Sequence, residues 1–155
     1  MGEMTIGGFI ARLAAAAVAM ESAQRSALER AAKVIEAEAK AEIGEYQGAA
    51  GPFAAWAPLA DATKKDRVAQ GYSEDDPLLR TGGLRDSISH AVARDEAVIG
   101  SNSEIAVYQE LGTATIPPRS FLGGAAVRKT AEVVKILGSA PVAALLGPGS
   151  AQRLP

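Results

Sequence analysis

Hydrophobic residues recur every three or four positions over the first part of the chain. This spacing runs from Ile6 to about Ile43 and predicts one long amphipathic helix, or two helices with a flexible joint. The pairs Glu29–Lys33 and Glu36–Lys40 lie off the apolar stripe with the favourable i,i+4 order. At 1.5 Å per residue the helix would be roughly 55 Å long, so its excess must pack on another copy or project as an arm. The apolar positions between its ends are Phe9, Ile10, Leu13, Val18, Leu28, Ala31, Val34, Ile35 and Ala39.

Glycines and prolines break this pattern between Gly44 and Pro58. Trp56 is the only tryptophan, and its place beside a proline predicts a packing anchor, with Leu59 close behind it. Ala60–Arg67 is predicted as a short helix whose basic cluster forms a solvated face. The next segment, residues 70–77, is polar and contains glycine, which predicts a loop.

Alternating residues then predict a β-hairpin. Ile88–Val92 and residues 97–100 form two short apolar segments, separated by a polar turn at residues 94–96. The hairpin follows a turn at Gly82-Gly83, with Arg80 and Arg85 on either side. We expect Leu84 and Ile88 to anchor the core together with Trp56 and Leu59.

The segment Tyr108–Gly124, YQELGTATIPPRSFLGG, combines an aromatic residue, an acid, a glycine and two prolines. The prolines exclude a helix across the middle of the segment, and Gly112 provides a position where φ can be positive. A stiff extended loop would therefore bring Arg119 and Phe121 to one place, at the start of a helix. The alternative is a plain connection with Phe121 in the core, which is the commoner outcome for such a pattern. Residues 102–111 are predicted to form a helical turn carrying Tyr108.

A second helix is predicted over residues 125–137, ended by Gly138, with a further short turn over residues 141–146. The chain of 155 residues fits one domain with extensions: a helical arm at 1–24, an α+β domain at 25–138 and a tail at 139–155. Alanine supplies much of the 48% hydrophobic content and aromatic residues only 5%, so the chain buries little apolar area per residue and needs partners.

Neither a targeting segment nor the net charge identifies a partner for this chain. The apolar run at residues 7–20 carries Arg12, lacks a basic segment before it and is shorter than a membrane span, so we expect a cytosolic protein without a membrane anchor. The formal net charge of −2 offers no argument for nucleic acid as the principal ligand.

The residues that catalysis requires are scarce. There is no cysteine, and the only histidine, His90, lies in a predicted strand, where a structural role is expected. The loop acids at residues 75–76 and 95–96 have no convergent partner, and no phosphate-binding glycine motif with a lysine is present. The sequence therefore predicts neither an enzyme nor a cofactor or metal site.

Three fragments follow the long helix in a fixed order: WAPLADATKK (56–65), LLRTGGLRDSI (78–88) and YQELGT…IPPRSFL (108–122). Together they resemble the virion morphogenesis proteins of tailed phages, the neck and tail-completion group, over residues 25–137. The chain departs from that pattern at Ser120, where a second proline is frequent, and at residues 105–106, where Tyr-Ala is commoner than Ile-Ala. Tyr108 is therefore not the tyrosine of the group's motif.

The resemblance implies an α+β protein in which a long N-terminal helix and a C-terminal helix pack on a small antiparallel sheet. It also implies a virion protein, assembled in the host cytoplasm as a sixfold or twelvefold homo-oligomeric ring at the neck or tail. Its expected partners are a head connector or adaptor, the tail tube or terminator, and DNA passing through the lumen without sequence reading; no membrane is expected. The expected subunit or partner contacts are Tyr108, Arg119, Phe121, Leu122, Arg80 and Arg85. The alternative is a cytosolic binding or regulatory module whose helix recognises a partner helix, with a hydrolase as a distant third.

Overall fold

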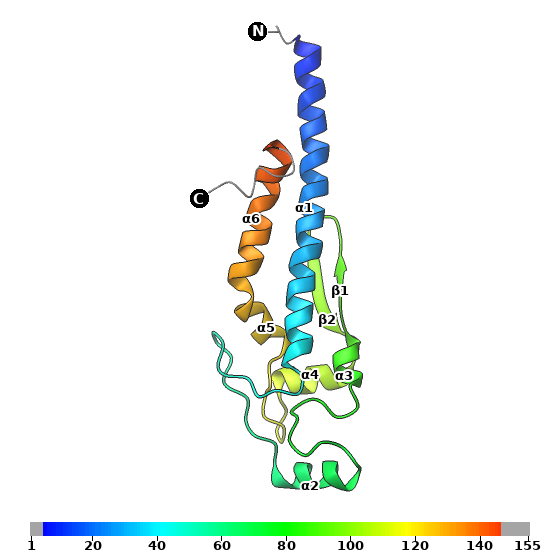
Figure 1. Ribbon diagram of the computed structural model, residues 1–155, viewed down its shortest axis with the longest axis vertical. Helices are drawn as coiled ribbons and strands as arrows, with labels where there is room; N and C mark the ends of the chain where they lie inside the picture. The colour runs from blue at the N-terminus through cyan, green and yellow to red at the C-terminus, as the bar shows by residue number, and fades with distance from the viewer. Residues whose placement is uncertain (1–4, 147–155) are drawn as a thin grey trace.

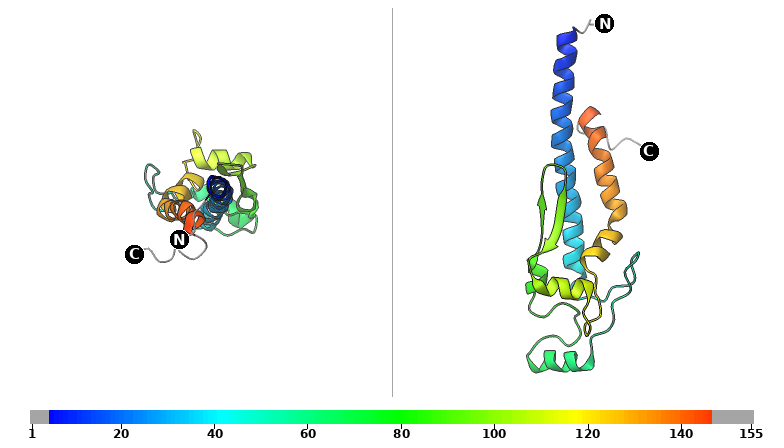
Figure 2. Two further views of the ribbon diagram at one scale, coloured as in Figure 1. Left: turned by 90° about the horizontal axis from the view of Figure 1, so that it is seen from above. Right: turned by 180° about the vertical axis from the view of Figure 1, so that it is seen from behind.

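A single long helix is the axis of the molecule. The computed structural model describes residues 5–146. Within them α1 (Ile6–Glu42) is continuous, so of the two alternatives that the sequence left open, the single long helix is the correct one. It begins at Thr5, whose hydroxyl oxygen accepts a hydrogen bond from the amide of Gly8 at 3.1 Å. Viewed from above, α1 lies at the centre, with the other elements around it (Figure 2).

The predicted hairpin is present. β1 (Ile88–Val92) and β2 (Ala97–Ser101) pair antiparallel, in a register that places Ile88 opposite Ser101 and Val92 opposite Ala97. A short helix, α3 (Gly83–Ser87), precedes the hairpin where the sequence predicted only a turn, and α4 (Glu104–Leu111) follows it. The hairpin lies along one side of the lower part of α1, and the C-terminal helix lies along another (Figure 1).

The C-terminal helices begin and end differently from the prediction. α5 (Leu122–Arg128) ends at Lys129, and α6 (Thr130–Leu146) then runs through both Gly138 and Pro141. The prediction that Gly138 ends the helix, with a separate turn at residues 141–146, is wrong. A glycine costs a helix only about 1 kcal/mol relative to alanine, and the packing of α6 along α1, with Ala140 buried, outweighs that cost. Residues 147–155 of the predicted tail lie outside the described residues.

The core lies at the carboxyl end of α1, where α3, α4 and α5 converge (Figure 1). Trp56, Leu84 and Ile88 belong to it, whereas Leu59 is only partly buried. The last small element, α2 (Asp61–Ala69), lies beyond this core at the end of the molecule (Figure 1). The architecture is the α+β arrangement that the sequence predicted. The core cluster consists of Ala39, Ile43, Trp56, Leu84, Ile88, Ala106, Phe121 and Ala125.

The amino-terminal half of α1 projects beyond this body (Figure 1). Its large apolar side chains are exposed by 51–81%, and the first buried residue of the helix is Ala27. By length and composition alone, α1 could cross a membrane, and the apolar window lies entirely on the surface. The sequence argument that this run is too short is thus incorrect, while the absence of a membrane partner stays a prediction. The exposed side chains are Ile6, Phe9, Ile10, Leu13 and Val18.

Candidate partner-binding site

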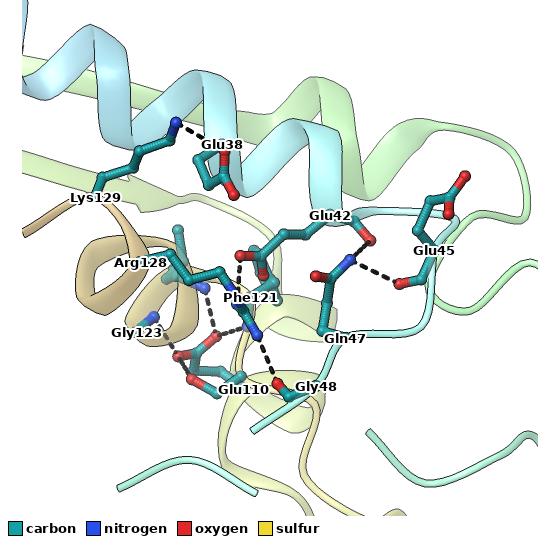
Figure 3. Close-up of polar contacts among 12 residues, drawn as sticks. Glu38, Glu42, Glu45, Gln47, Gly48, Glu110, Phe121, Gly123, Arg128 and Lys129 are labelled. Carbon is teal, nitrogen blue, oxygen red and sulfur yellow. Dashed lines mark hydrogen bonds and ion pairs between the residues drawn. The ribbon is translucent and has the colours of Figure 1, made fainter. Parts of the chain in front are cut away.

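The carboxylate of Glu110 organises the loop that contains the two prolines. Glu110 lies on α4, and its Oε2 accepts hydrogen bonds from the amides of Phe121 and Leu122, both at 2.9 Å. Its Oε1 accepts bonds from the Ser120 hydroxyl at 2.5 Å and the Gly123 amide at 2.8 Å (Figure 3). The first amides of a helix lack partners within the helix, so this carboxylate satisfies the start of α5 from a different element. α4 and α5 are thereby fixed to each other.

Gly112 and Thr113 shape the beginning of the same loop. Gly112 has φ = 75°, and a Cβ placed there would lie 2.9 Å from both the Ile116 oxygen and the Pro118 nitrogen. Thr113 donates its amide to the Ile116 oxygen at 2.8 Å, and its hydroxyl accepts from the Ile116 amide at 3.1 Å. The predicted positive φ at Gly112 is confirmed, and the glycine is required because the loop folds back over it.

Arg119 and Phe121 both point into the chain. Arg119 is 4% exposed, and its guanidinium donates to the Ala57 oxygen at 2.8 and 3.1 Å and to the Pro58 oxygen at 3.2 Å. Phe121 is fully buried in the core with Trp56. The alternative that placed Phe121 in the core is therefore correct. In this chain both side chains hold the Pro-Pro loop against the Trp56 segment, and a contact of either residue with a partner stays a prediction.

The remaining residues expected at a partner contact lie closer to the surface. Tyr108 on α4 is 48% exposed, and Leu122 is partly buried. Arg80 pairs with Asp66 at 2.6 Å, while Arg85 is exposed and lies 3.7 Å from Asp86. A partner role for these residues stays a prediction.

A cavity of about 610 Å³ lies between α2, the Leu78–Leu84 segment, α4 and the Pro-Pro loop. It brings Arg80 and Arg119 together, as the sequence predicted for residues near the loop, but Arg85 and Tyr108 do not line it. Arg67 also lines it and is 4% exposed. The prediction that Arg67 belongs to a solvated face is therefore wrong. The pattern of apolar positions in the helix did not indicate that Arg67 is buried, because it would place Val68 inside, and Val68 is exposed. The other lining residues are Pro58, Leu59, Ala60, Thr63, Leu78, Thr81, Gly82, Leu84, Ile105, Gln109, Thr115, Ile116 and Pro117.

Three acidic residues of α1 make contacts that the sequence did not indicate. Glu42 is 2% exposed and pairs with Arg128 of α5 at 2.6 Å (Figure 3). Burial raises the pKa of Glu42 to about 7, and the charge of Arg128 opposes this shift. Glu36 and Glu29 bind the two ring nitrogens of His90, the latter at 3.1 Å from Nε2.

His90 connects the hairpin to α1. Hydrogen bonds that the His90 ring donates to Glu36, and then to Glu29, raise the pKa of His90. The pKa of Glu29 is lowered in turn, first by His90 and then by Lys33. In residues 5–146 no group of three or more acidic or histidine side chains is placed to hold a metal ion. The contact is structural, because it joins β1 to the helix against which β1 packs.

The loop and the cavity therefore depend on the same short motifs that carried the resemblance. The model of the phage virion morphogenesis family matches residues 9–147, which is most of the chain. The chain belongs to the phage virion morphogenesis family. Membership indicates a structural or assembly role in the virion. Comparisons with curated proteins and with solved structures each give no match. In this member of the phage virion morphogenesis family, the motif residues Glu110, Gly112 and Arg119 determine how the loop is folded.

Proposed function

We propose that the protein forms a homo-oligomeric ring at the head–tail junction or the tail end of a phage particle, where it joins or completes the tail. The observation that carries this proposal is the exposed apolar stripe on the projecting half of α1, where Ile6 is 81% and Val18 69% exposed. Isolated soluble proteins rarely leave a contiguous apolar surface of this kind in water. Copies packed side by side would bury it.

A second exposed apolar surface supports a ring rather than a closed pair. Val107 and Leu111 of α4, one helical turn apart, are 54% and 73% exposed, and α4 lies near the carboxyl end of α1, far from the tip that projects (Figure 1). Two different surfaces favour contacts in which unlike faces of neighbouring copies meet, and such contacts close into a ring when the rotation between copies permits it.

The projecting half of α1 carries Arg12 and Glu21 within its apolar run. A charge at the centre of a membrane-spanning helix is costly, whereas a helix packed between protein subunits can place both charges at the edge of the contact. This supports burial of α1 between subunits instead of in a lipid bilayer. Small alanine side chains at residues 14–17 also permit close approach of helix backbones.

The decisive experiment removes the gene from the phage or prophage that encodes it and images the particles by electron microscopy. We expect unjoined heads and tails, or tails of abnormal length, with the defect restored by the wild-type gene. Particles of normal form and number would refute the proposal.

A second measurement follows the mass of the purified protein over a range of concentrations, with negative-stain imaging. We expect rings, either alone or on adding the connector or tail-tube protein, and loss of rings in Leu13→Asp. Val98→Asp is the matched control, because Val98 is 59% exposed and Leu13 55%, on different elements. If the wild-type protein formed no rings under any of these conditions and floated with lipid vesicles, the results would favour a lipid bilayer as the partner of α1 instead.

A further inference from the structure

The cavity beside the Pro-Pro loop contains positive charge without any acid. Three arginines line it, Arg67, Arg80 and Arg119, and no aspartate or glutamate is among the lining residues. This contrasts with the chain as a whole, whose formal net charge is −2. The residues that line it come from α2, α3, α4, the Pro-Pro loop and the segments that lead into α2 and α3.

Two of these arginines are buried without a direct ion pair, although Asp75 lies near enough to Arg67 for their charges to interact. Arg67 and Arg119 are each 4% exposed. Arg67 donates to the Ser73 oxygen at 2.7 Å and to the Leu79 oxygen, while Arg119 donates to the oxygens of Ala57 and Pro58. Neither forms an ion pair with a carboxylate of residues 5–146. A buried charge is costly unless it is paired, so both sites would gain from an anion.

Each guanidinium also retains a donor that can serve that anion. The hydrogen bonds of Arg67 and Arg119 use Nε and Nη2, and Nη1 of each has no partner in the described part of the chain. Burial lowers the pKa of Arg119, because it removes part of the water around the guanidinium. Guanidinium groups bind carboxylates through short, charge-assisted hydrogen bonds.

The rest of the lining favours a peptide as the source of the anion. Gln109 lines the cavity, and its Oε1 is buried with no hydrogen-bond partner in the described residues. This oxygen can accept from a peptide amide, a donor that an inorganic phosphate or a DNA backbone lacks. A cavity of about 610 Å³ is large enough for a short peptide segment. The apolar lining, Leu59, Leu78, Leu84, Ile105, Ile116 and Pro117, suits aliphatic side chains next to the acid.

We infer that this cavity binds an acidic segment of another virion protein, with a carboxylate at Arg67 and Arg119 and a peptide amide at Gln109. The partner inserts a side chain into this protein, which reverses the expectation that Arg119 projects into the partner. Arg80 stays at the rim, held by Asp66 at 2.6 Å and lying 5.1 Å from the centre of the Tyr72 ring. The inference rests on the proposed function and adds the chemistry of the partner.

An internal carboxylate provides the sharpest test. Thr63 lines the cavity one helical turn before Arg67 on α2, so Thr63→Glu places an acid at i,i+4 to a buried arginine. Thr63→Gln is the matched control, with the same size and no charge. We expect Thr63→Glu to melt about 2 °C or more above Thr63→Gln at neutral pH. The difference between the two melting temperatures should disappear as the pH falls through the pKa of the new carboxyl, about 4.3.

Binding is measured with two labelled peptides in the full-length protein. The acidic probe is Ala-Leu-Asp-Glu-Leu-Ala, and its neutral counterpart is Ala-Leu-Asn-Gln-Leu-Ala. We expect the wild type and Thr63→Gln to bind the acidic probe at least about tenfold more tightly than the neutral one, and Thr63→Glu to lose this preference.

Three results would overturn the inference: equal melting temperatures for the two variants, equal affinity for the two peptides, or tighter binding of a DNA duplex that Thr63→Glu also abolishes. The last result would assign the cavity to phosphate. None of them changes the particles that form when the gene is deleted. The inference and the proposed function can therefore fail separately.

Discussion

The carboxylate of Glu110 accepts a hydrogen bond from the backbone amide of Phe121 at 2.9 Å, while the Phe121 side chain is fully buried in the core. One residue of the loop thus has its backbone fixed by α4 and its side chain fixed by the packing of the core. The loop is rigid because of contacts within this chain, before any partner binds. Its exposed surface is then a preformed surface, which reduces the entropy lost on association.

The first prediction concerns this carboxylate. Glu110→Gln replaces one acceptor oxygen with an NH₂ group, which faces amides that are themselves donors. We expect the free energy of unfolding to fall by about 1–3 kcal/mol, measured by urea denaturation. Glu104→Gln on the same helix is the control, because Glu104 is exposed, and the hydrogen bonds from α4 side chains to the start of α5 within residues 5–146 are those of Glu110. Equal stability of the two variants would contradict the role given to Glu110.

The second prediction concerns the fold of the loop at Gly112. Gly112→Ala places a Cβ 2.9 Å from the backbone oxygen of Ile116, in a conformation that non-glycine residues rarely adopt. We expect a loss of about 1–3 kcal/mol in unfolding free energy and faster amide hydrogen exchange at Thr113. Gly48→Ala is the control, since a Cβ at Gly48 meets nothing within 4 Å. A loss no larger than that of the control would show that the loop can refold around the methyl group.

The sequence predicted the elements whose cause is local. The apolar spacing specified α1, the alternation specified the hairpin, and the Gly-Thr and Pro-Pro residues specified a folded loop at Gly112. The same local patterns do not show which side chains of the loop are buried in the core and which are exposed. Phe121 and Arg119 carried a recognisable motif, but whether the motif faced outwards or inwards depended on segments more than fifty residues away, such as Ala57.

The wrong predictions have the same cause, because each depends on a contact with a residue that is distant in the sequence. Arg67 is buried because carbonyls of the loop after α2 turn back to its guanidinium, and a helical pattern cannot indicate such a partner. α6 continues through Gly138 because it packs along α1, which is distant in the sequence. Glu42 looked like any polar helix residue, and only its pairing with Arg128 explains how it can be 2% exposed.

The third prediction is a pH dependence of the contact between the hairpin and α1. The pKa of His90 is raised by Glu36 and Glu29, so this contribution to stability is fully present below pH 6.5 and is lost as the pH rises through the folded-state pKa. The pKa values of Glu29 and Glu36 are lowered, so their contribution is present above pH 4.5 and is lost as the pH falls. The contact is therefore strongest between these two values. Lys33 and Lys40 pair with the same glutamates, and the pKa of Glu36 is lowered first by Lys40 and then by His90.

His90→Gln isolates this effect. We expect the difference in unfolding free energy between the wild type and His90→Gln to be larger at about pH 5.5 than at about pH 8. Denaturant titrations at both pH values measure this difference. The other titrating groups are present in both proteins, so their contributions cancel in the difference. A difference that is independent of pH would contradict the raised pKa, because it would mean that folding leaves the pKa of His90 unchanged.

The last prediction concerns the buried pair of Glu42 and Arg128. Burial raises the pKa of Glu42 to about 7, so ionisation of Glu42 opposes folding increasingly as the pH rises from its usual value of 4.5 through that pKa. Arg128→Met removes the charge that opposes this shift, and it leaves the carboxylate buried without its partner. We expect Arg128→Met to lose about 3–5 kcal/mol of unfolding free energy at neutral pH and distinctly less near about pH 4.5. Adding Glu42→Gln should recover part of the loss at neutral pH, because no charge then remains in the site. If the double variant were less stable than Arg128→Met at neutral pH, the cost would come from lost packing and not from the unpaired charge.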